Sequence, residues 1–147
     1  MDGVDPQRLA EFCAERRWAG DRASQALGMR IESVGSGHSV ITMTVREDML
    51  NGHDRCHGGY IFTLADSAFA FACNTYGRVT VAQGAGIDFV RPARLGDVLR
   101  AEARELSRGG RTGVYDVEVH RGDGKLIACF RGNSFTTDES MTGDRDS

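Results

Sequence analysis

The sequence predicts an α+β fold in which a curved antiparallel sheet wraps around one long, buried helix. Two observations indicate this fold. The stretch from Asn51 to Tyr76 begins as a polar loop with glycines and continues into a segment that is apolar on nearly every side. From Val79 onward, segments with alternating apolar and polar residues follow one another, separated by turn residues. A helix that is apolar all round must be covered, and a curved sheet is the simplest cover.

An additional helix is predicted near the N-terminus. Asp5 is a favourable N-cap residue, and Pro6 suits the first helical position, where the missing N–H has no intrahelical partner to lose. We expect this helix to end between Trp18 and Gly20. The apolar residues that share one of its faces are Leu9, Phe12 and Cys13.

A β-hairpin and the central helix are predicted next. Residues 27–34 and 39–46 both alternate between apolar and polar side chains, and residues 35–37 (Gly-Ser-Gly) form a turn between them. The central helix is expected to begin near Gly59, and Gly77 is expected to end it as a C-cap glycine.

Four further strands are predicted over residues 79–90, 98–106, 115–119 and 126–136. Because short turns join them, we expect consecutive strands to be antiparallel neighbours. Gly84 and Gly86 share one face of the first of these strands, which predicts that another segment packs closely against the backbone there. We expect residues 1–137 to form a single domain and the polar residues 138–147 to be a disordered tail.

The composition excludes several classes of protein. The 147 residues carry a formal charge of −3, which argues against nucleic acid as a main partner because phosphate binding needs a basic patch. No segment has the pattern of a signal peptide or of a membrane span. The cysteines are far apart and form no CxxC pair, so we expect free thiols and a cytoplasmic location. These cysteines are Cys13, Cys56, Cys73 and Cys129.

Asp66 lies in the middle of the predicted central helix. Its neighbours one and two turns away include no cation; they are Phe62, Phe69, Ala70 and Cys73. An ionised carboxylate in apolar surroundings is unfavourable unless it is paired or hydrogen-bonded. One interpretation is that Asp66 caps a neighbouring element or meets an arginine from another strand. The functional interpretation is a general base or a nucleophile.

The loop before this helix has features of an oxyanion site. Residues 56–59 (Cys-His-Gly-Gly) lead into the helix, so its first N–H groups are free to hold a developing negative charge. The glycines also fit a loop that merely turns. Asn51 can orient a water or a carbonyl, or it can simply form a turn with Gly52. His57 can bind a substrate carbonyl or only satisfy the loop. A metal site at His53, Cys56 and His57 is disfavoured because no second cluster of ligands follows.

These residues also carry a family resemblance. The segment HGGYIFTLAD (57–66), preceded by NGH and followed by SAFAFACN, resembles the signature of hotdog-fold acyl-CoA thioesterases. More narrowly, it is similar to the phenylacetic acid degradation branch, the PaaI-type thioesterases. The similarity continues through DFVRPARLGD (88–97), RTGVYDVEV (111–119) and ACFRGNS (128–134). The resemblance implies hydrolysis of an acyl-CoA, with an aromatic phenylacetyl or hydroxyphenylacetyl group, to a free acid and coenzyme A, without a cofactor.

The resemblance also implies roles for individual residues. It makes Asp66 the acidic helix residue, Gly58 the oxyanion glycine, Asn51 the residue that positions water or substrate, and His57 its companion before the glycine. The residues expected to bind substrate are Gly59, Arg91, Arg94, Arg111 and Thr112, with Arg108 as a further candidate for the phosphates of coenzyme A.

The spacing of two of these residues predicts a shared site. Gly58 and Asp66 are eight residues apart, which on a helix corresponds to about 12 Å. Groups that act on one carbonyl must both lie within about 3 Å of the reacting atoms. We therefore expect a two-fold dimer with antiparallel central helices, and the resemblance adds a tetramer built from two dimers. The alternatives are a hotdog enoyl-CoA hydratase or dehydratase and a non-catalytic acyl-CoA-binding module.

Overall fold

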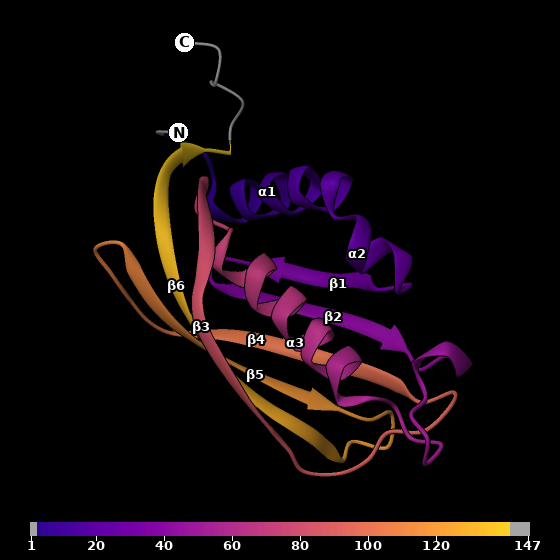
Figure 1. Cartoon of the computed structure of the whole chain (residues 1–147). Coiled ribbons are helices and arrows are strands. Elements are labelled where there is room, and N and C mark those ends of the chain that lie inside the picture. The colour runs from indigo at the N-terminus through magenta and orange to yellow at the C-terminus, as the bar shows by residue number, and fades with distance from the viewer. Residues whose placement is uncertain (1–2, 142–147) are drawn as a thin grey trace.

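The computed structural model describes residues 3–141, in which one antiparallel sheet curves around a helix (Figure 1). Its strands lie in the order β1-β2-β4-β5-β6-β3. In chain order the elements are α1 (Pro6–Gly20), α2 (Arg22–Ala26), β1 (Arg30–Gly35), β2 (His38–Thr44), the 3-10 turn η1 (Glu47–Met49), α3 (Gly58–Cys73), β3 (Arg78–Phe89), β4 (Val98–Gly109), β5 (Thr112–His120) and β6 (Leu126–Ser140). The predicted α+β fold, with its wrapped helix and its additional N-terminal helix, is confirmed.

α3 occupies the concave side of the sheet because half of its surface is strongly apolar. Phe69 lies at the centre of this core, with its ring centroid 5.6 Å from that of Tyr115 and 5.8 Å from that of Phe130. Gly132 on β6 leaves room for the Phe69 ring, since a Cβ at position 132 would lie 2.8 Å from it. Burial of a side chain of this size contributes about 1.5–3 kcal/mol to stability.

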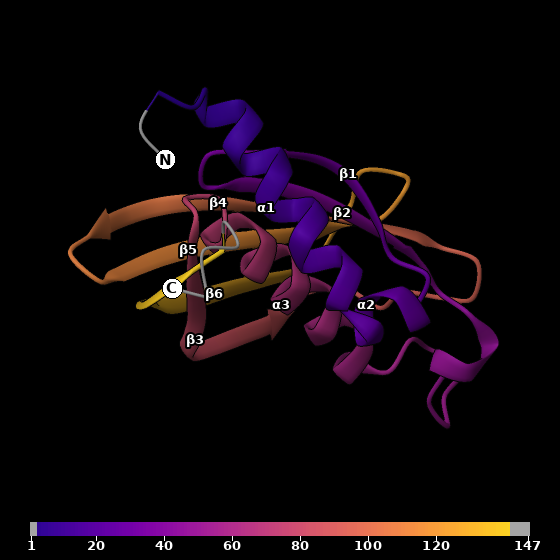
Figure 2. The ribbon, with the colours of Figure 1, turned by 90° about the horizontal axis from the view of Figure 1, so that it is seen from above.

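α1 covers part of α3 and one edge of the sheet. Figure 2 shows α1 crossing above α3. The ring centroids of Trp18 on α1 and Phe71 on α3 are 6.3 Å apart. The side-chain amide of Gln7 donates a hydrogen bond of 2.8 Å to the carbonyl of Val34, which occupies part of the open edge of β1. The N-terminal helix is therefore an integral layer of the structure.

Two boundaries differ from the sequence prediction. The strand predicted from residue 27 begins at Arg30, because Asp21 accepts hydrogen bonds from the backbone and side chain of Ser24 and caps the short helix α2. The central helix ends at Cys73, before the predicted Gly77. The side chain of Asn74 replaces the next helical turn: it donates to the carbonyl of Ala70 and exchanges two hydrogen bonds with the backbone of Thr80.

The pairing of the later strands differs in one place. β4 pairs with β5 and β5 with β6, as predicted, but β3 pairs with β6 and not with β4. Residues 90–97 cross from one side of the sheet to the other, so the prediction of antiparallel neighbours is wrong for this connection. This crossover is anchored at both ends: Cys56 donates to the carbonyl of Ala93, and Val45 exchanges hydrogen bonds with the backbone of Gly96 and Asp97.

β3 is an edge strand with an irregularity that the sequence pattern does not reveal. Its pairing with β6 skips Gln83, which forms a β-bulge between Ala82 and Gly84. An extra residue reverses the faces of the residues before it, so Thr80 is buried and Val81 is 46% exposed. Nothing among the described residues lies within 4 Å of a Cβ built at Gly84 or Gly86, so the predicted close packing is not made by residues 3–141 of the same chain.

The C-terminal boundary also shifts. β6 continues to Ser140, and Met141 is buried, so the domain extends beyond the predicted limit at residue 137. The rest of the predicted disordered tail, residues 142–147, lies outside the described residues.

Candidate functional site

The loop before α3 is organised by the side chain of Asn51. Its Oδ1 accepts hydrogen bonds from the backbone N–H groups of His53 (2.9 Å) and Arg55 (3.2 Å). The backbone N–H of Asn51 donates to the carbonyl of Arg55 at 2.7 Å, which closes the turn. The Nδ2 amide of Asn51 has no partner among residues 3–141, so this donor is available to a ligand.

The first turn of α3 leaves one backbone donor free. His57 is the N-cap residue, and its Nδ1 accepts the N–H of Gly59 at 2.9 Å. The N–H of His57 itself donates to the carbonyl of Met49 at 2.8 Å. Within the described part of the chain the N–H of Gly58 has no acceptor, and it lies at the positive end of the helix dipole. This donor can therefore bind a carbonyl oxygen or an anion.

Gly58 lies in a groove of about 380 Å³. Phe89 forms one wall and packs so closely that a Cβ at position 58 would lie 3.0 Å from its ring. The groove brings together the predicted residues Asn51, Gly58 and Arg91. The residues that line it are Asn51, Arg55, Cys56, Gly58, Ile61, Phe89, Val90, Arg91 and Pro92. Phe89 and Arg55 were not predicted; the signal for Phe89 was its place at the end of an apolar strand face.

Asp66 lies two turns further along α3 and is half-buried. No hydrogen bond or ion pair within residues 3–141 involves its carboxylate. Burial raises the pKa of Asp66, and the positive charge of Arg17 on α1 opposes that rise. The predicted absence of a cation on the same helix is confirmed, while the cation that does act comes from the N-terminal helix.

The face of α3 that carries Asp66 is more open than the sequence predicts. Thr63, Asp66 and Ala70 are all partly exposed, whereas the opposite face is buried against the sheet. Ser67 is also partly exposed, but its hydroxyl is hydrogen-bonded to that of Ser24 on α2. These side chains are small or polar, so the prediction of a helix covered on every side is wrong within one chain. The open stripe leaves room for another helix to approach closely.

The arginines predicted to bind substrate lie at two ends of the sheet. Arg91 and Arg94 are exposed near the start of α3, where Arg91 donates to the carbonyl of Leu126 and Arg94 makes no side-chain hydrogen bond within the described residues. Arg111 lies at the far tip of the β4–β5 hairpin, beside Thr112. Its guanidinium binds the carbonyl of Thr136 and the carboxylate of Asp138, so the structure does not bring it into the groove. Arg108 lies in the same region, with its Cζ 3.5 Å from the centroid of the Tyr76 ring.

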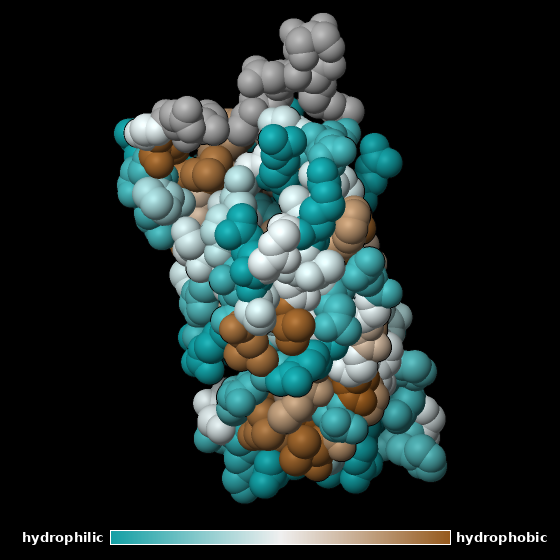
Figure 3. Space-filling model, turned by 90° about the vertical axis from the view of Figure 1, so that its left-hand side faces the viewer, coloured by the Kyte–Doolittle hydropathy of each residue, from teal (hydrophilic) through white to brown (hydrophobic). Residues whose placement is uncertain are grey.

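Apolar residues are exposed along the β3 edge. Phe89 is 53% and Val90 is 48% exposed, and they continue from Val81 along the same strand and its end. Figure 3 views the side on which β3 and β6 lie, and apolar side chains gather in its lower half. A long edge strand with exposed apolar residues is a surface suited to pairing with another strand.

The thiols are unsuited to nucleophilic roles. All four cysteines are free, in agreement with the sequence prediction. Burial raises the pKa of Cys56 to about 11 and that of Cys73 to about 12, so both remain protonated near neutral pH.

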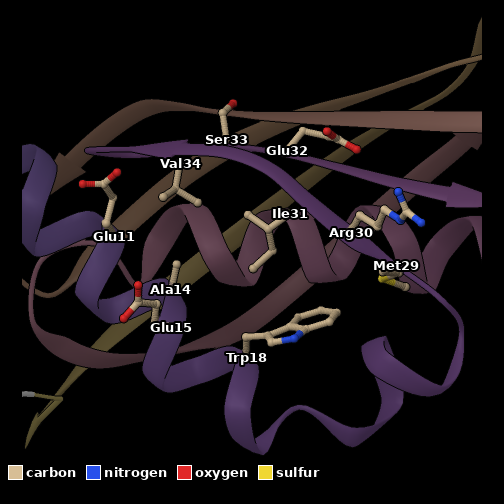
Figure 4. A pocket seen from close by; sticks show the side chains of 10 residues that line it. All are labelled: Glu11, Ala14, Glu15, Trp18, Met29, Arg30, Ile31, Glu32, Ser33 and Val34. Carbon is tan, nitrogen blue, oxygen red and sulfur yellow. The ribbon is translucent and has the colours of Figure 1, made fainter.

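A second, larger cavity of about 600 Å³ lies between α1 and β1. In Figure 4, Ile31 and Val34 point from β1 toward Trp18 and Ala14 on α1, while the carboxylates of Glu11 and Glu15 lie at one end. None of the predicted site residues lines this cavity. Within residues 3–141 no helix is long and apolar enough to span a membrane.

Comparison with known proteins agrees with this geometry. The profile of the Thioesterase superfamily matches residues 53–128, which include α3 and every residue of the groove except Asn51. The chain belongs to this superfamily, and it is a thioester hydrolase with the hotdog fold.

Individual relatives indicate which kind of thioesterase this chain is similar to. The chain is 46% identical over 131 residues to the acyl-coenzyme A thioesterase PaaI of Escherichia coli K12, covering 89% of this chain and 94% of the relative. The solved structure of E. coli PaaI, from the phenylacetic acid degradation operon, superposes with a TM-score of 0.91 at 43% identity over 92% of this chain and 99% of that one. A Streptococcus mutans protein solved with acetyl CoA matches with a TM-score of 0.73 at 29% identity, over 76% of this chain and 90% of that one.

Proposed function

We propose that the protein hydrolyses acyl-CoA thioesters at a site shared by two copies of the chain. The observation that carries this proposal is the placement of two groups on α3. A free N–H at Gly58 and an unpaired carboxylate at Asp66 are separated by eight residues, or about 12 Å along the helix. One substrate carbonyl cannot contact both groups of a single chain, but antiparallel pairing of two α3 helices brings each Asp66 to the Gly58 of its partner.

Two features support this pairing. The open stripe with Thr63, Asp66 and Ala70 lets a second helix approach, because its side chains are small or polar. The exposed edge of β3 lets the two sheets join, because antiparallel pairing of two β3 strands continues the hydrogen-bonded ladder across the dimer. The two-fold rotation that pairs the β3 strands would also bring Arg91 of one chain toward the end of the partner's sheet that carries Arg111 and Thr112. A tetramer would then consist of two such dimers.

The proposed chemistry uses each group in one role. The Gly58 N–H and the helix dipole polarise the thioester carbonyl and stabilise the oxyanion that forms. Asn51 Nδ2 and His57 orient the water or the substrate at the mouth of the groove. Asp66 either activates a water or attacks the carbonyl to give an anhydride that water then cleaves. Incorporation of oxygen-18 from solvent into Asp66 during a single turnover identifies the anhydride route.

The substrate follows from the relatives and from charge. Arg94 and Arg91 supply cations near the groove for the phosphates of coenzyme A. Gly59 is less available, because its N–H donates to His57 and its carbonyl accepts from Thr63. Arg111 is less available because it is paired with Asp138. A phenylacetyl or hydroxyphenylacetyl group is proposed for the acyl portion, on the similarity to PaaI. Four free thiols fit a reducing cytoplasm.

The direct test is release of free thiol from a panel of aliphatic and aromatic acyl-CoAs. We expect turnover by the wild-type protein, with aromatic acetyl-CoAs among the best substrates. Asp66→Asn should lose turnover while acyl-CoA binding, measured by calorimetry, stays within a few-fold. Hydration of an enoyl-CoA without thiol release would favour the hydratase alternative, and binding without either reaction would favour the binding module.

The shared site has its own test. Mixing Asp66→Asn chains with Gly58→Val chains, each inactive alone, should restore activity, because each mixed dimer then contains one site with both wild-type groups. The valine side chain of Gly58→Val would lie very close to the Phe89 ring. The fold of this variant is therefore checked first by circular dichroism. Absence of any recovery in mixtures that exchange subunits would contradict sharing.

A further inference from the structure

Phe89 at the end of β3 is directed toward the start of α3. It lies opposite Ala128 in a regular part of the β3–β6 ladder. The N–H of Val90 donates to the carbonyl of Ile127 at 2.7 Å and fixes the end of the strand. Ile87, two residues before Phe89, packs against the core, so both residues lie on the concave face of the sheet. The backbone of β3 therefore holds the Phe89 ring in place, although the residue is 53% exposed.

The ring lies beside the free N–H of Gly58. A Cβ built at position 58 would be 3.0 Å from Cζ and 3.2 Å from Cε1 of Phe89. The Cα–Cβ bonds of an α-helix tilt toward its N-terminus, and the unpaired N–H groups of the first turn point the same way. A carbonyl that binds this N–H therefore has the aromatic ring on one side. A single additional carbon between Gly58 and the ring would already crowd it.

The groove around Gly58 has an apolar part and a cationic part. The apolar lining includes Phe89 and Ile61, which is buried and lies one helical turn after Gly58. The cationic lining is formed by Arg55 and Arg91. Cations suit the phosphates of coenzyme A, whereas an acyl chain is stabilised by apolar contacts. The acyl group is therefore the part of the thioester that contacts Phe89.

We infer that Phe89 determines the acyl specificity of the enzyme: it admits acyl groups whose first carbon after the carbonyl is an unbranched CH₂ and excludes groups that are branched there. This inference rests on the proposed function, because it takes the Gly58 N–H as the site of the thioester carbonyl. The first acyl carbon is bonded to that carbonyl, so a methyl branch on it meets the ring that already crowds position 58. Rejection of one such group by packing corresponds to about 10- to 200-fold in kcat/KM.

The experiment compares n-butyryl-CoA with isobutyryl-CoA in assays of thiol release. The two substrates are isomers and differ only in the branch beside the carbonyl. We expect the wild-type protein to favour n-butyryl-CoA by at least about 10-fold in kcat/KM. Phe89→Ala should reduce this ratio to about 3 or less, because the shorter side chain leaves space for the branch. The aromatic isomers 3-phenylpropionyl-CoA and 2-phenylpropionyl-CoA should show the same change.

Two further variants control for general effects. Phe89→Leu retains an apolar side chain without the ring and should give a ratio between those of the wild type and Phe89→Ala. Leu106→Ala is the matched control, since Leu106 is also 53% exposed but lies outside the groove, and it should keep the wild-type ratio. Phe89 lies on the edge proposed to join two chains, so light scattering first compares the oligomeric state of each variant with that of the wild type. Phe89→Leu supplies the test if Phe89→Ala does not assemble.

The outcomes separate this inference from the proposed function. Equal kcat/KM values of the wild-type protein for the two butyryl isomers, or a wild-type ratio in an assembled Phe89→Ala variant, would overturn the role of Phe89. Calorimetry with Asp66→Asn tests that role without turnover: isobutyryl-CoA should bind more weakly than n-butyryl-CoA, and adding Phe89→Ala should remove the difference. Absence of thiol release from any acyl-CoA together with this binding preference would overturn the proposed function alone. Absence of thiol release with equal binding of both isomers would overturn both.

Discussion

Two half-buried carboxylates of this protein, Asp66 on α3 and Glu105 on β4, have opposite surroundings. The Oε1 of Glu105 accepts hydrogen bonds from the hydroxyl groups of Tyr76 (2.7 Å) and Tyr115 (3.0 Å). Within residues 3–141 Asp66 accepts none; burial raises its pKa, and the positive charge of Arg17 opposes that rise. Glu105 is thus bound as a structural acceptor, while Asp66 is left with free lone pairs at a cost in stability.

A carboxylate that serves folding and one that serves chemistry can therefore be distinguished by the donors around them. A buried acceptor whose donors are all present contributes to stability, and its removal leaves those donors without a partner. A buried acceptor without donors is unfavourable for the fold and is retained where its reactivity is used. The two residues should therefore respond in opposite ways to substitution.

The largest expected effect is on turnover in Asp66→Asn. We expect kcat to fall about 10²- to 10⁴-fold, while the free energy of unfolding at pH 7 is unchanged or rises by about 1 kcal/mol. The rise follows because burial raises the pKa of Asp66: the unfolded chain loses this proton at lower pH, so ionisation weakens the fold as pH increases through that window. Thiol release and urea denaturation measure both quantities. A marked loss of stability would contradict the comparison.

Glu105→Ala should show the reverse pattern. We expect the free energy of unfolding to fall by about 2 kcal/mol, because the buried hydroxyl of Tyr115 loses its acceptor. Turnover at temperatures below unfolding should change little. The matched control is Glu118→Ala on β5, whose side chain is 52% exposed; it should change stability by less than about 0.5 kcal/mol. A large loss of turnover without a loss of stability would place Glu105 in the chemistry instead.

Alkaline pH should test the hydrogen bonds of Tyr76 and Tyr115 to Glu105 without a mutation. Burial, together with the hydrogen bond to Glu105 and its charge, raises the pKa of Tyr76 to about 12, and burial likewise raises the pKa of Tyr115. The folded state therefore holds these protons to higher pH than the unfolded chain does. The stability that the two protonated tyrosine hydroxyl groups contribute is fully present below about pH 10. It should be lost as pH rises toward 12. Denaturant midpoints at pH 9 and pH 11 measure it.

The smallest effect is expected for Tyr76→Phe, which removes one of the two donors to Glu105. Tyr115 remains, so stability at pH 8 should fall by only about 1 kcal/mol. The alkaline loss of stability should become shallower, since one of the two titrating hydroxyl groups is gone. An unchanged alkaline profile would show that Tyr76 does not contribute to it.

Much of this arrangement was predictable from local patterns. The helix that carries Asp66, the loop that frees the Gly58 N–H and the absence of a cation on the same helix all follow from residues that are close in sequence. Arg17 was not predictable, because the contact of α1 with α3 depends on packing between segments about fifty residues apart. The Tyr76–Glu105–Tyr115 cluster likewise joins the loop after α3 to the β4–β5 hairpin, a contact that no periodicity predicts.

The errors in the fold have the same origin. Asn74 ends α3 before Gly77 because its side chain donates to the carbonyl of Thr80 on β3 and accepts from the N–H of the same residue. A propensity rule does not include that strand. The bulge at Gln83 is marked in the sequence by the adjacent Gly84, but the prediction took this glycine as a sign of close packing and not of a bulge. The crossover of residues 90–97 is as short as a turn between neighbouring strands. The sequence therefore predicts that β3 pairs with β4, whereas it pairs with β6.

That crossover has a kinetic consequence. It holds the groove and the sheet together, since Ala93 accepts from Cys56 beside the groove while Gly96 and Asp97 bond to Val45 at the end of β2. Local opening of this segment must therefore release both partners in one event. The amide hydrogens of Val45, Cys56 and Gly96 should exchange with solvent at similar rates, and a ligand in the groove should slow all three together.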